Sequence, residues 1–123
     1  MKALVIDDSR AMRRMLSAFM TTHAGSENVE AEDGLYALEY LERFSPFDVA
    51  LVDWDMPRLS GLEFVKAVRA DPRYDDLKLL MVTARNDGAD LEEALTAGAD
   101  DFLMKPLSEN MVVEKLRILG FIA

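Results

Sequence analysis

The segment Val49–Pro57, Val-Ala-Leu-Val-Asp-Trp-Asp-Met-Pro, places a continuous apolar run directly before two acidic residues. Apolar residues at consecutive positions, rather than at alternate ones, are typical of a parallel strand that is buried on both faces. The run Val49–Val52 is therefore predicted to be an inner strand, and Asp53 stands at its carboxyl end. In an open parallel sheet, ligands bind at the edge formed by these carboxyl ends.

Similar short apolar runs recur along the chain, and segments with helical periodicity separate them. The other runs are Ala3–Ile6, the weaker Val29–Ala31, Leu79–Val82 and Phe102–Met104. The helical stripes are Met12, Met15, Leu16 and Phe19, then Leu35, Leu38 and Leu41, then Leu62, Val65 and Val68, then Leu91, Ala94 and Leu95, and finally Val112, Leu116 and Leu119. Five strands that alternate with five helices predict one α/β domain with a parallel sheet and right-handed crossovers.

Capping residues mark where these helices begin and end. Ser60 and Glu63 have the spacing of a capping box at the start of the third helix. Further predicted N-caps are Ser9, Asp87 and Ser108, and predicted helix ends are Gly25, Gly98 and Gly120.

The composition limits the function. The chain has 123 residues, of which 50% are hydrophobic, enough for one core. Fourteen Lys and Arg against 23 Asp and Glu give a net charge of −9, which argues against direct DNA binding. The absence of Cys excludes disulfides and thiol chemistry, and a single His makes a His-based relay a poor prediction. With no apolar run near ~18 residues and no signal-peptide layout, the sequence predicts a cytoplasmic protein without membrane insertion.

Polar residues follow four of the five predicted strands. Asp7 and Asp8 follow the first strand, Asp53 the third, Thr83 the fourth, and Lys105 the fifth. All of them are expected at one edge of the sheet, where clustered carboxylates repel unless cations compensate. Oxygen ligands of this kind suit Mg²⁺. A carboxylate beside Mg²⁺, a lysine and a hydroxyl is equipped to attack a phosphoryl group.

Four short motifs resemble one known family when they are taken together in this order. They are Asp7-Asp8-Ser9, Asp53-x-x-Met56-Pro57, Thr83-Ala84 and Lys105-Pro106. This combination is similar to the receiver domain of bacterial response regulators, and residues 7–14 resemble the stand-alone chemotaxis type known as CheY. The resemblance covers nearly the whole chain and implies a doubly wound, flavodoxin-like sheet of order 2-1-3-4-5. It also implies a single receiver domain over residues 1–123 without an effector domain.

The resemblance also assigns roles to individual residues. Asp53 would accept a phosphoryl group from the phosphohistidine of a sensor histidine kinase or a phosphotransfer domain. Asp8 and Asp53 would bind Mg²⁺ through their side chains, Asp55 through its backbone carbonyl, and Asp7 mostly through water. Lys105 would pair with Asp53 at rest, and its bond to Pro106 is a candidate cis peptide. Thr83 and Phe102 would form the switch, since Phe102 lies three residues before the lysine.

Several neighbouring residues allow two interpretations. Asp55 and Arg85 stand at positions that tune dephosphorylation in receivers, and they are equally well explained as an exposed salt bridge. Trp54 is interpreted as a partly exposed loop aromatic rather than a lid beside the phosphate. Arg10, Arg13 and Arg14 either attract an acidic partner or neutralise Asp7 and Asp8 while solvated, and His23 is expected to be an exposed helix-end residue.

The function expected from the sequence is therefore a monomeric phospho-acceptor switch, not a metabolic enzyme, with slow autodephosphorylation. Two alternatives remain at this point. Asp53-Trp54-Asp55 has the Asp-x-Asp form of a haloacid-dehalogenase-type phosphatase, although it lies on the third strand and no cap domain is evident. A pseudo-receiver that only docks a partner is the other alternative. The sequence does not identify the cognate kinase or the downstream target.

Overall fold

Five parallel strands form one sheet in the order β2-β1-β3-β4-β5, which confirms the topology expected from the resemblance. The structure is a computed structural model and describes all residues, 1–123. Along the chain the elements are β1 (Lys2–Ile6), α1 (Arg10–Ala24), β2 (Glu27–Ala31), α2 (Gly34–Phe44), β3 (Val49–Asp53), α3 (Gly61–Arg69), the 3₁₀ helix η1 (Pro72–Tyr74), β4 (Lys78–Thr83), α4 (Gly88–Ala97), β5 (Asp101–Met104) and α5 (Glu109–Ile118).

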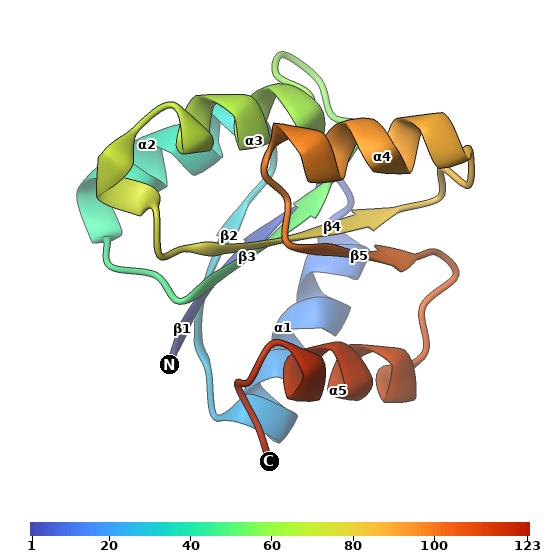
Figure 1. Cartoon of the computed structure of the whole chain (residues 1–123). Coiled ribbons are helices and arrows are strands. Elements are labelled where there is room, and N and C mark those ends of the chain that lie inside the picture. Colours follow the sequence, from blue (N-terminus) through green and yellow to red (C-terminus); the bar gives the residue numbers. More distant parts are fainter.

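The helices cover both faces of the sheet, as Figure 1 shows, with α2, α3 and α4 on one face and α1 and α5 on the other. Each face buries its own apolar cluster. Leu4 and Ile6 of β1 pack with α2, α3 and α4, whereas Ala3 and Val5 of the same strand pack with α1 and α5. Consecutive residues in the middle of each inner strand therefore all lie in a core, which is why these strands are continuously apolar between their ends. None of the helices combines the length and the apolar character that a membrane-spanning segment requires.

The predicted helix boundaries agree with the structure. The side chain of Ser60 accepts the amide of Glu63, and the reciprocal bond completes the capping box of α3. Ser9, Asp87 and Ser108 are the N-caps of α1, α4 and α5; Gly25 and Gly98 are the C-caps of α1 and α4, and Gly120 follows the C-cap of α5. The N-cap of α2 is Asp33, which the sequence patterns had not singled out.

Two predicted stripes were partly wrong. Leu35 of α2 and Leu95 of α4 are 43% and 42% exposed and do not belong to the core. The buried surface of α2 instead runs through Ala37 and Leu41. Spacing alone places leucines on a common side of a helix but does not fix how far round that helix the sheet contact extends.

Candidate functional site

The polar residues predicted at the strand ends do converge on one edge of the sheet. Asp53 is the last residue of β3, and Thr83 is the last residue of β4. Asp7 and Lys105 directly follow β1 and β5. Because β1, β3, β4 and β5 are adjacent and parallel, their carboxyl ends bring these four side chains together.

Lys105 joins the two buried carboxylates of this edge. Its Nζ donates to Asp53 Oδ1 at 3.2 Å and to Asp7 Oδ2 at 3.3 Å. Asp7 is 1% exposed and Asp53 is 6% exposed, so both negative charges lie largely out of water. The other oxygen of this carboxylate, Asp53 Oδ2, has no hydrogen bond to the protein.

Burial and crowding shift the proton affinities of this cluster. Burial and the nearby Asp7 carboxylate raise the pKa of Asp53 to about 6, although Lys105 opposes the shift. Burial disfavours the charge on Lys105, but the attraction of Asp53 and Asp7 outweighs it, so the pKa of Lys105 is raised. At neutral pH Asp53 is therefore mainly a carboxylate whose negative charge is only partly compensated.

The acidic residues differ in how much freedom they have to bind a metal. One carboxylate oxygen from each of Asp7, Asp8 and Asp53 lies within 4.8 Å of the others. Asp7 is already engaged, because Oδ1 accepts the amide of Ser9 and Oδ2 accepts Lys105. Asp8 is exposed and forms no ion pair. This set of hard oxygen donors fits Mg²⁺, which uses one or two carboxylates and keeps several waters.

A close backbone approach at Gly61 positions the loop after Asp53. The amide of Gly61 donates to the Trp54 carbonyl at 2.8 Å. A Cβ atom added at Gly61 would lie 2.2 Å from the carbonyl oxygen of Asp53, so only glycine lets α3 begin this close to the end of β3. The sequence shows that Gly61 directly follows the capping residue Ser60. It does not show that the carbonyl of Asp53 lies against Gly61 in the folded chain.

Thr83 is buried with its hydroxyl group at the same edge. The hydroxyl oxygen accepts the amide of Arg85 at 3.0 Å, which leaves the hydroxyl proton free to donate. The carbonyl of Thr83 accepts the amide of Lys105 at 2.8 Å, so the ends of β4 and β5 are fixed to each other. The Lys105–Pro106 peptide bond is cis.

Arg85 contacts three side chains beside Asp53, two on the loop after β3 and one on α4. Its guanidinium donates to Asp55 at 2.6 Å and to Asp90 of α4 at 3.1 Å, and it lies 4.9 Å from the Trp54 ring. The interpretation of Trp54 as a partly exposed loop aromatic was wrong, because its side chain packs into the core and the residue is 5% exposed. Asp90 was not identified from the sequence, since an acidic residue in the first turn of a helix is common there for electrostatic reasons alone.

Phe102 lies partly buried on β5. The Nζ of Lys115 lies 5.7 Å from its ring and donates to Asp101 at 2.8 Å. The ring lines a shallow pocket of ≈ 440 Å³ between β5 and α5, together with residues that include Met104 and Met111.

Two expectations about basic residues need correction. Arg13 is not solvated, because it donates to the Asp7 carbonyl at 2.7 Å and pairs with Glu30 at 3.3 Å. It thus binds the backbone near the site rather than neutralising the Asp7 carboxylate, whereas Arg10 and Arg14 are exposed as expected. His23 is partly buried and contacts Glu109 of α5.

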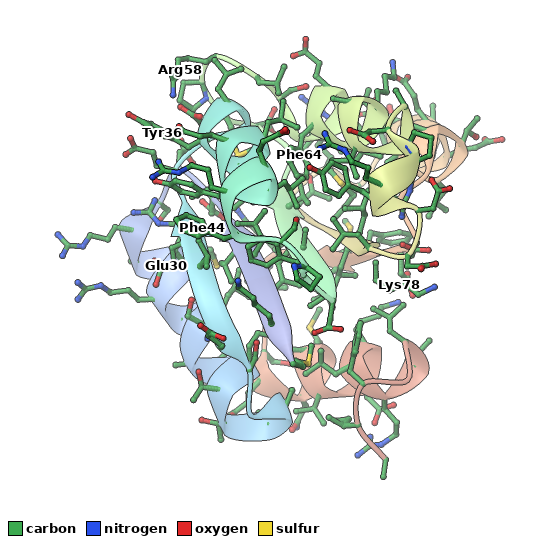
Figure 2. All side chains as sticks on the ribbon, turned by 90° about the vertical axis from the view of Figure 1, so that its left-hand side faces the viewer. Glu30, Tyr36, Phe44, Arg58, Phe64 and Lys78 are labelled. Carbon is green, nitrogen blue, oxygen red and sulfur yellow. The ribbon has the colours of Figure 1, made fainter.

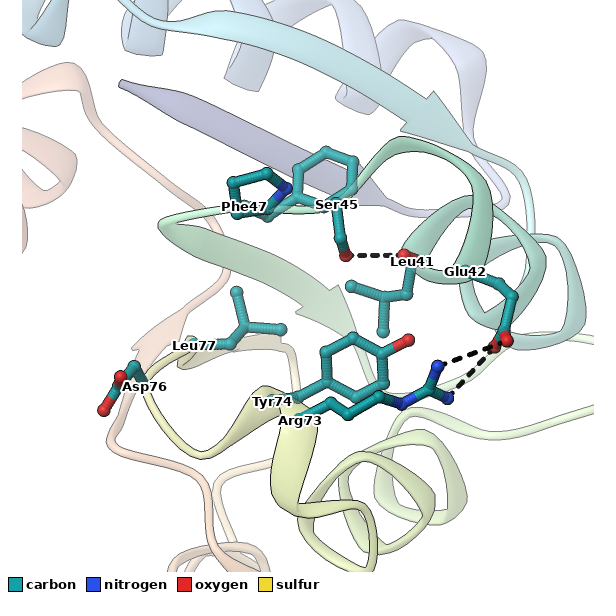
Figure 3. Close-up of a pocket in the computed structure, with 9 residues that line it drawn as sticks. Leu41, Glu42, Ser45, Phe47, Arg73, Tyr74, Asp76 and Leu77 are labelled. Atoms are coloured by element: carbon teal, nitrogen blue, oxygen red, sulfur yellow. Dashed lines mark hydrogen bonds and ion pairs between the residues drawn. The ribbon is translucent and has the colours of Figure 1, made fainter.

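A second pocket lies far from the acidic residues. It has a volume of ≈ 300 Å³ and is lined by the end of α2, the segment before β3, and η1 with the segment before β4, as Figure 3 shows. Leu41, Phe47 and Leu77 provide apolar walls, and the Arg73–Glu42 ion pair stands beside them. Because these segments precede the strands, the pocket is at the amino end of the sheet.

Comparisons with known proteins agree with this geometry. Residues 3–117 match the family described as the response regulator receiver domain. The chain belongs to this family. The receiver domain is 39% identical over 121 residues to the chemotaxis protein CheY homolog of Campylobacter jejuni, covering 98% of this chain and 93% of that protein. It is 36% identical over 119 residues to chemotaxis protein CheY1 of Helicobacter pylori, covering 97% and 96%.

Solved structures give the same result. The crystallised chemotaxis response regulator CheY4 of Vibrio cholerae superposes with a TM-score of 0.88 at 35% identity, covering 96% of this chain and 97% of that chain. The protein is thus a receiver domain of the CheY type, and such domains are signalling switches rather than classical enzymes. This membership removes the haloacid-dehalogenase alternative.

Proposed function

We propose that this receiver domain is a phospho-acceptor switch in which Asp53 takes a phosphoryl group from a phosphohistidine. The observation that carries the proposal is the buried Asp53–Lys105 pair, in which Oδ1 is held at 3.2 Å and Oδ2 is free. The phosphorus–nitrogen bond of the donor breaks as a phosphorus–oxygen bond to the ionised Asp53 carboxylate forms, and the leaving imidazole takes up a proton from solvent. The donor is a sensor histidine kinase or a phosphotransfer domain.

The surrounding residues suit this transfer. A pKa of about 6 leaves Asp53 mainly ionised at neutral pH, so its free oxygen is nucleophilic. Lys105 already contacts this carboxylate and is positioned to neutralise charge on the phosphoryl oxygens. Asp8 and Asp53 would hold Mg²⁺ through their side chains, Asp55 through its carbonyl, and Asp7 mostly through water. When bound, Mg²⁺ supplies positive charge against the phosphoryl oxygens.

The proposed switch links Thr83 to Phe102. The free hydroxyl proton of Thr83 is available to donate to a phosphoryl oxygen on Asp53. A shift of Thr83 toward Asp53 would vacate volume near the loop before α4, into which the partly buried Phe102 ring would rotate. Arg85 and Asp55 would tune the lifetime of the phosphoryl group, because their contact spans the loops on either side of it.

The decisive experiment is stoichiometric labelling with a small phosphodonor and Mg²⁺. The wild-type chain should take up one base-labile phosphoryl group, and Asp53→Asn should take up none. Asp48→Asn is the matched control, since Asp48 precedes the same strand at its opposite end. Asp8→Asn should raise the Mg²⁺ concentration that labelling requires. Full labelling of Asp53→Asn would refute the acceptor assignment, and a protein that never labels would support the docking pseudo-receiver instead.

A further inference from the structure

Asp7 has a hydrogen-bond partner for every polar atom of its backbone and side chain. Its amide donates to the Ala31 carbonyl at 3.1 Å, and its carbonyl accepts Nη1 of Arg13 at 2.7 Å. Its carboxylate accepts the amide of Ser9 at 2.9 Å through Oδ1 and the Nζ of Lys105 at 3.3 Å through Oδ2. The peptide groups on both sides of Asp7 are therefore fixed at the end of β1.

Asp8, the next residue, has no such contacts. It is exposed, its carboxylate forms no hydrogen bond or ion pair within the chain, and one of its oxygens lies within 4.8 Å of oxygens of Asp7 and Asp53. The carbonyl of Asp7 belongs to the same planar peptide unit as the amide and Cα of Asp8. A contact that holds this carbonyl therefore also sets the direction in which the Asp8 side chain leaves the backbone.

The guanidinium that holds the Asp7 carbonyl is itself held from the other side. Arg13 lies on α1, and its side chain is only 14% exposed. Its Nε pairs with Oε1 of Glu30 at 3.3 Å, and the hydroxyl of Ser17 donates to Oε2 of Glu30 at 3.3 Å. Figure 2 shows Glu30 on the edge strand β2, beside α1. The rigid, planar guanidinium thus connects β2 to the peptide that precedes Asp8.

The neighbouring arginines show that this contact is specific to one position. Arg10 and Arg14 also lie on the first turns of α1, but both are exposed and neither forms an ion pair. Arg13 is the one that bonds to the acidic loop, and its charge is balanced by Glu30. A balanced pair adds little net positive charge to the site, so its main effect there is on geometry.

From these contacts we infer that Arg13 is a positioning residue for the Mg²⁺ site and that Glu30 acts through it. Neither side chain touches the ion. Together they orient Asp8 before the metal arrives, so that less of the loop has to become ordered when Mg²⁺ binds. The inference rests on the Mg²⁺ binding of the proposed function, to which it adds two residues outside the acidic cluster.

The test is an NMR titration of the full chain with MgCl₂, without a phosphodonor, followed at the amide of Asp8. Arg13→Gln should weaken Mg²⁺ binding by about tenfold, because contacts that orient metal ligands have effects of this size. Loss of a positive charge would by itself strengthen the binding of a cation, so positioning and electrostatics predict opposite directions. Arg14→Gln is the matched control, since it removes the same charge from the next residue and should not weaken binding.

A measurement without metal separates positioning from a general loss of stability. The Asp8 amide resonance of the metal-free chain should shift in Arg13→Gln and stay in place in Arg14→Gln, because only Arg13 bonds to the carbonyl of that peptide. Thermal melts of the same samples establish that each variant is folded at the temperature of the titration. An Asp8 resonance that is the same in Arg13→Gln as in the wild type would contradict the positioning role.

The part played by Glu30 is tested by combining variants. Glu30→Gln should weaken Mg²⁺ binding several-fold, and adding it to Arg13→Gln should cause no further loss, since Glu30 acts through Arg13. Fully additive losses would overturn this dependence. An Arg13→Gln chain that binds MgCl₂ as tightly as Arg14→Gln does would overturn the inference while leaving the proposed function intact. A wild-type chain that does not respond to MgCl₂ would refute the Mg²⁺ site itself, and the inference with it.

Discussion

At the carboxyl end of the sheet, Asp7, Asp53 and Lys105 hold their charges largely out of water, with side-chain exposures of 1%, 8% and 22%. At the amino end, Arg73 and Glu42 face each other with exposures of 61% and 62%. Two buried carboxylates share one lysine at the first end, whereas charges at the second end are paired in solvent. A protein tolerates the first arrangement, which costs stability, where it is used for chemistry.

The difference follows from the direction of the strands. Parallel strands bring the carboxyl ends of β1, β3, β4 and β5 to one edge, where Asp7, Asp53, Thr83 and Lys105 lie at or just after the strand ends. At the opposite edge, the apolar side chains of Leu41, Phe47 and Leu77 cover the end of the core. The pocket there has no buried charge and lies outside the proposed phosphoryl chemistry.

The largest effect on stability is expected at Gly61, where packing against the acceptor loop is tightest. Gly61→Ala places a Cβ 2.2 Å from a backbone oxygen that cannot move without shifting Asp53. We expect a loss of about 3 kcal/mol, or a fall in Tm of about 10 °C. Gly88→Ala is the matched control, because Gly88 also opens a helix but has no atom within 4 Å. Equal melting temperatures for the two variants would contradict the role of Gly61.

The next largest effect is expected from Asp53→Asn, measured without Mg²⁺. The pKa of Asp53 is about 6 in the folded chain, above the 3.8 of an ordinary Asp, so the folded state binds this proton more tightly than the unfolded state. Stability from this group is present at low pH and is lost as the pH rises through about 6. The Asp53→Asn variant has no carboxylate to ionise at this position, so it does not lose this stability. Its free energy of unfolding should exceed that of the wild type by on the order of 2–3 kcal/mol at pH 8 and by almost nothing at pH 4.

The control for this pH dependence is the same substitution at the other end of the sheet. Asp76→Asn changes an exposed carboxylate beside the amino-end pocket and should alter denaturant unfolding little at either pH. An advantage of Asp53→Asn that stays constant between pH 4 and pH 8 would show that relief of buried charge is not its cause.

A smaller effect, on rate rather than on stability, is expected from Arg85→Gln. Loss of the contact with Asp55 opens the approach to a phosphoryl group on Asp53. We expect dephosphorylation to accelerate roughly three- to tenfold. Radiolabel decay after donor removal measures this rate, with Arg73→Gln as the control at the opposite end. An unchanged decay rate would remove Arg85 from the lifetime proposal.

The smallest effect is expected at the amino end itself. Arg73 is exposed and contacts both Asp71 and Glu42 in solvent, where ion pairs contribute little because water and salt screen them. Arg73→Gln and Glu42→Gln should each leave Tm within about 2 °C of the wild type. A large fall in Tm for either variant would mean that the two ends of the sheet do not differ as described.

The candidate site was largely predictable because its polar residues stand directly after apolar runs in the sequence. A carboxylate directly after an apolar run has few structural reasons to be there, and the strand ends pointed to Asp7, Asp53, Thr83 and Lys105. The residues that the sequence did not reveal act through partners distant in the chain. Asp90 accepts a hydrogen bond from Arg85, which lies on the loop before α4. Gly61 leaves room for the carbonyl oxygen of Asp53.

Local sequence patterns were enough to predict the five strands, most of the helix caps and the acidic edge, because each depends on local periodicity or on neighbours three or four residues away. Which side chains leave water depends on how the elements pack in the folded protein. Trp54 is covered by the core, Arg13 turns to the Asp7 carbonyl, and Leu35 remains exposed on α2. The physical reason is that burial depends on which surfaces the folded elements bring into contact. A hydrophobic pattern gives the direction of a side chain along its own element but not the neighbour that covers it.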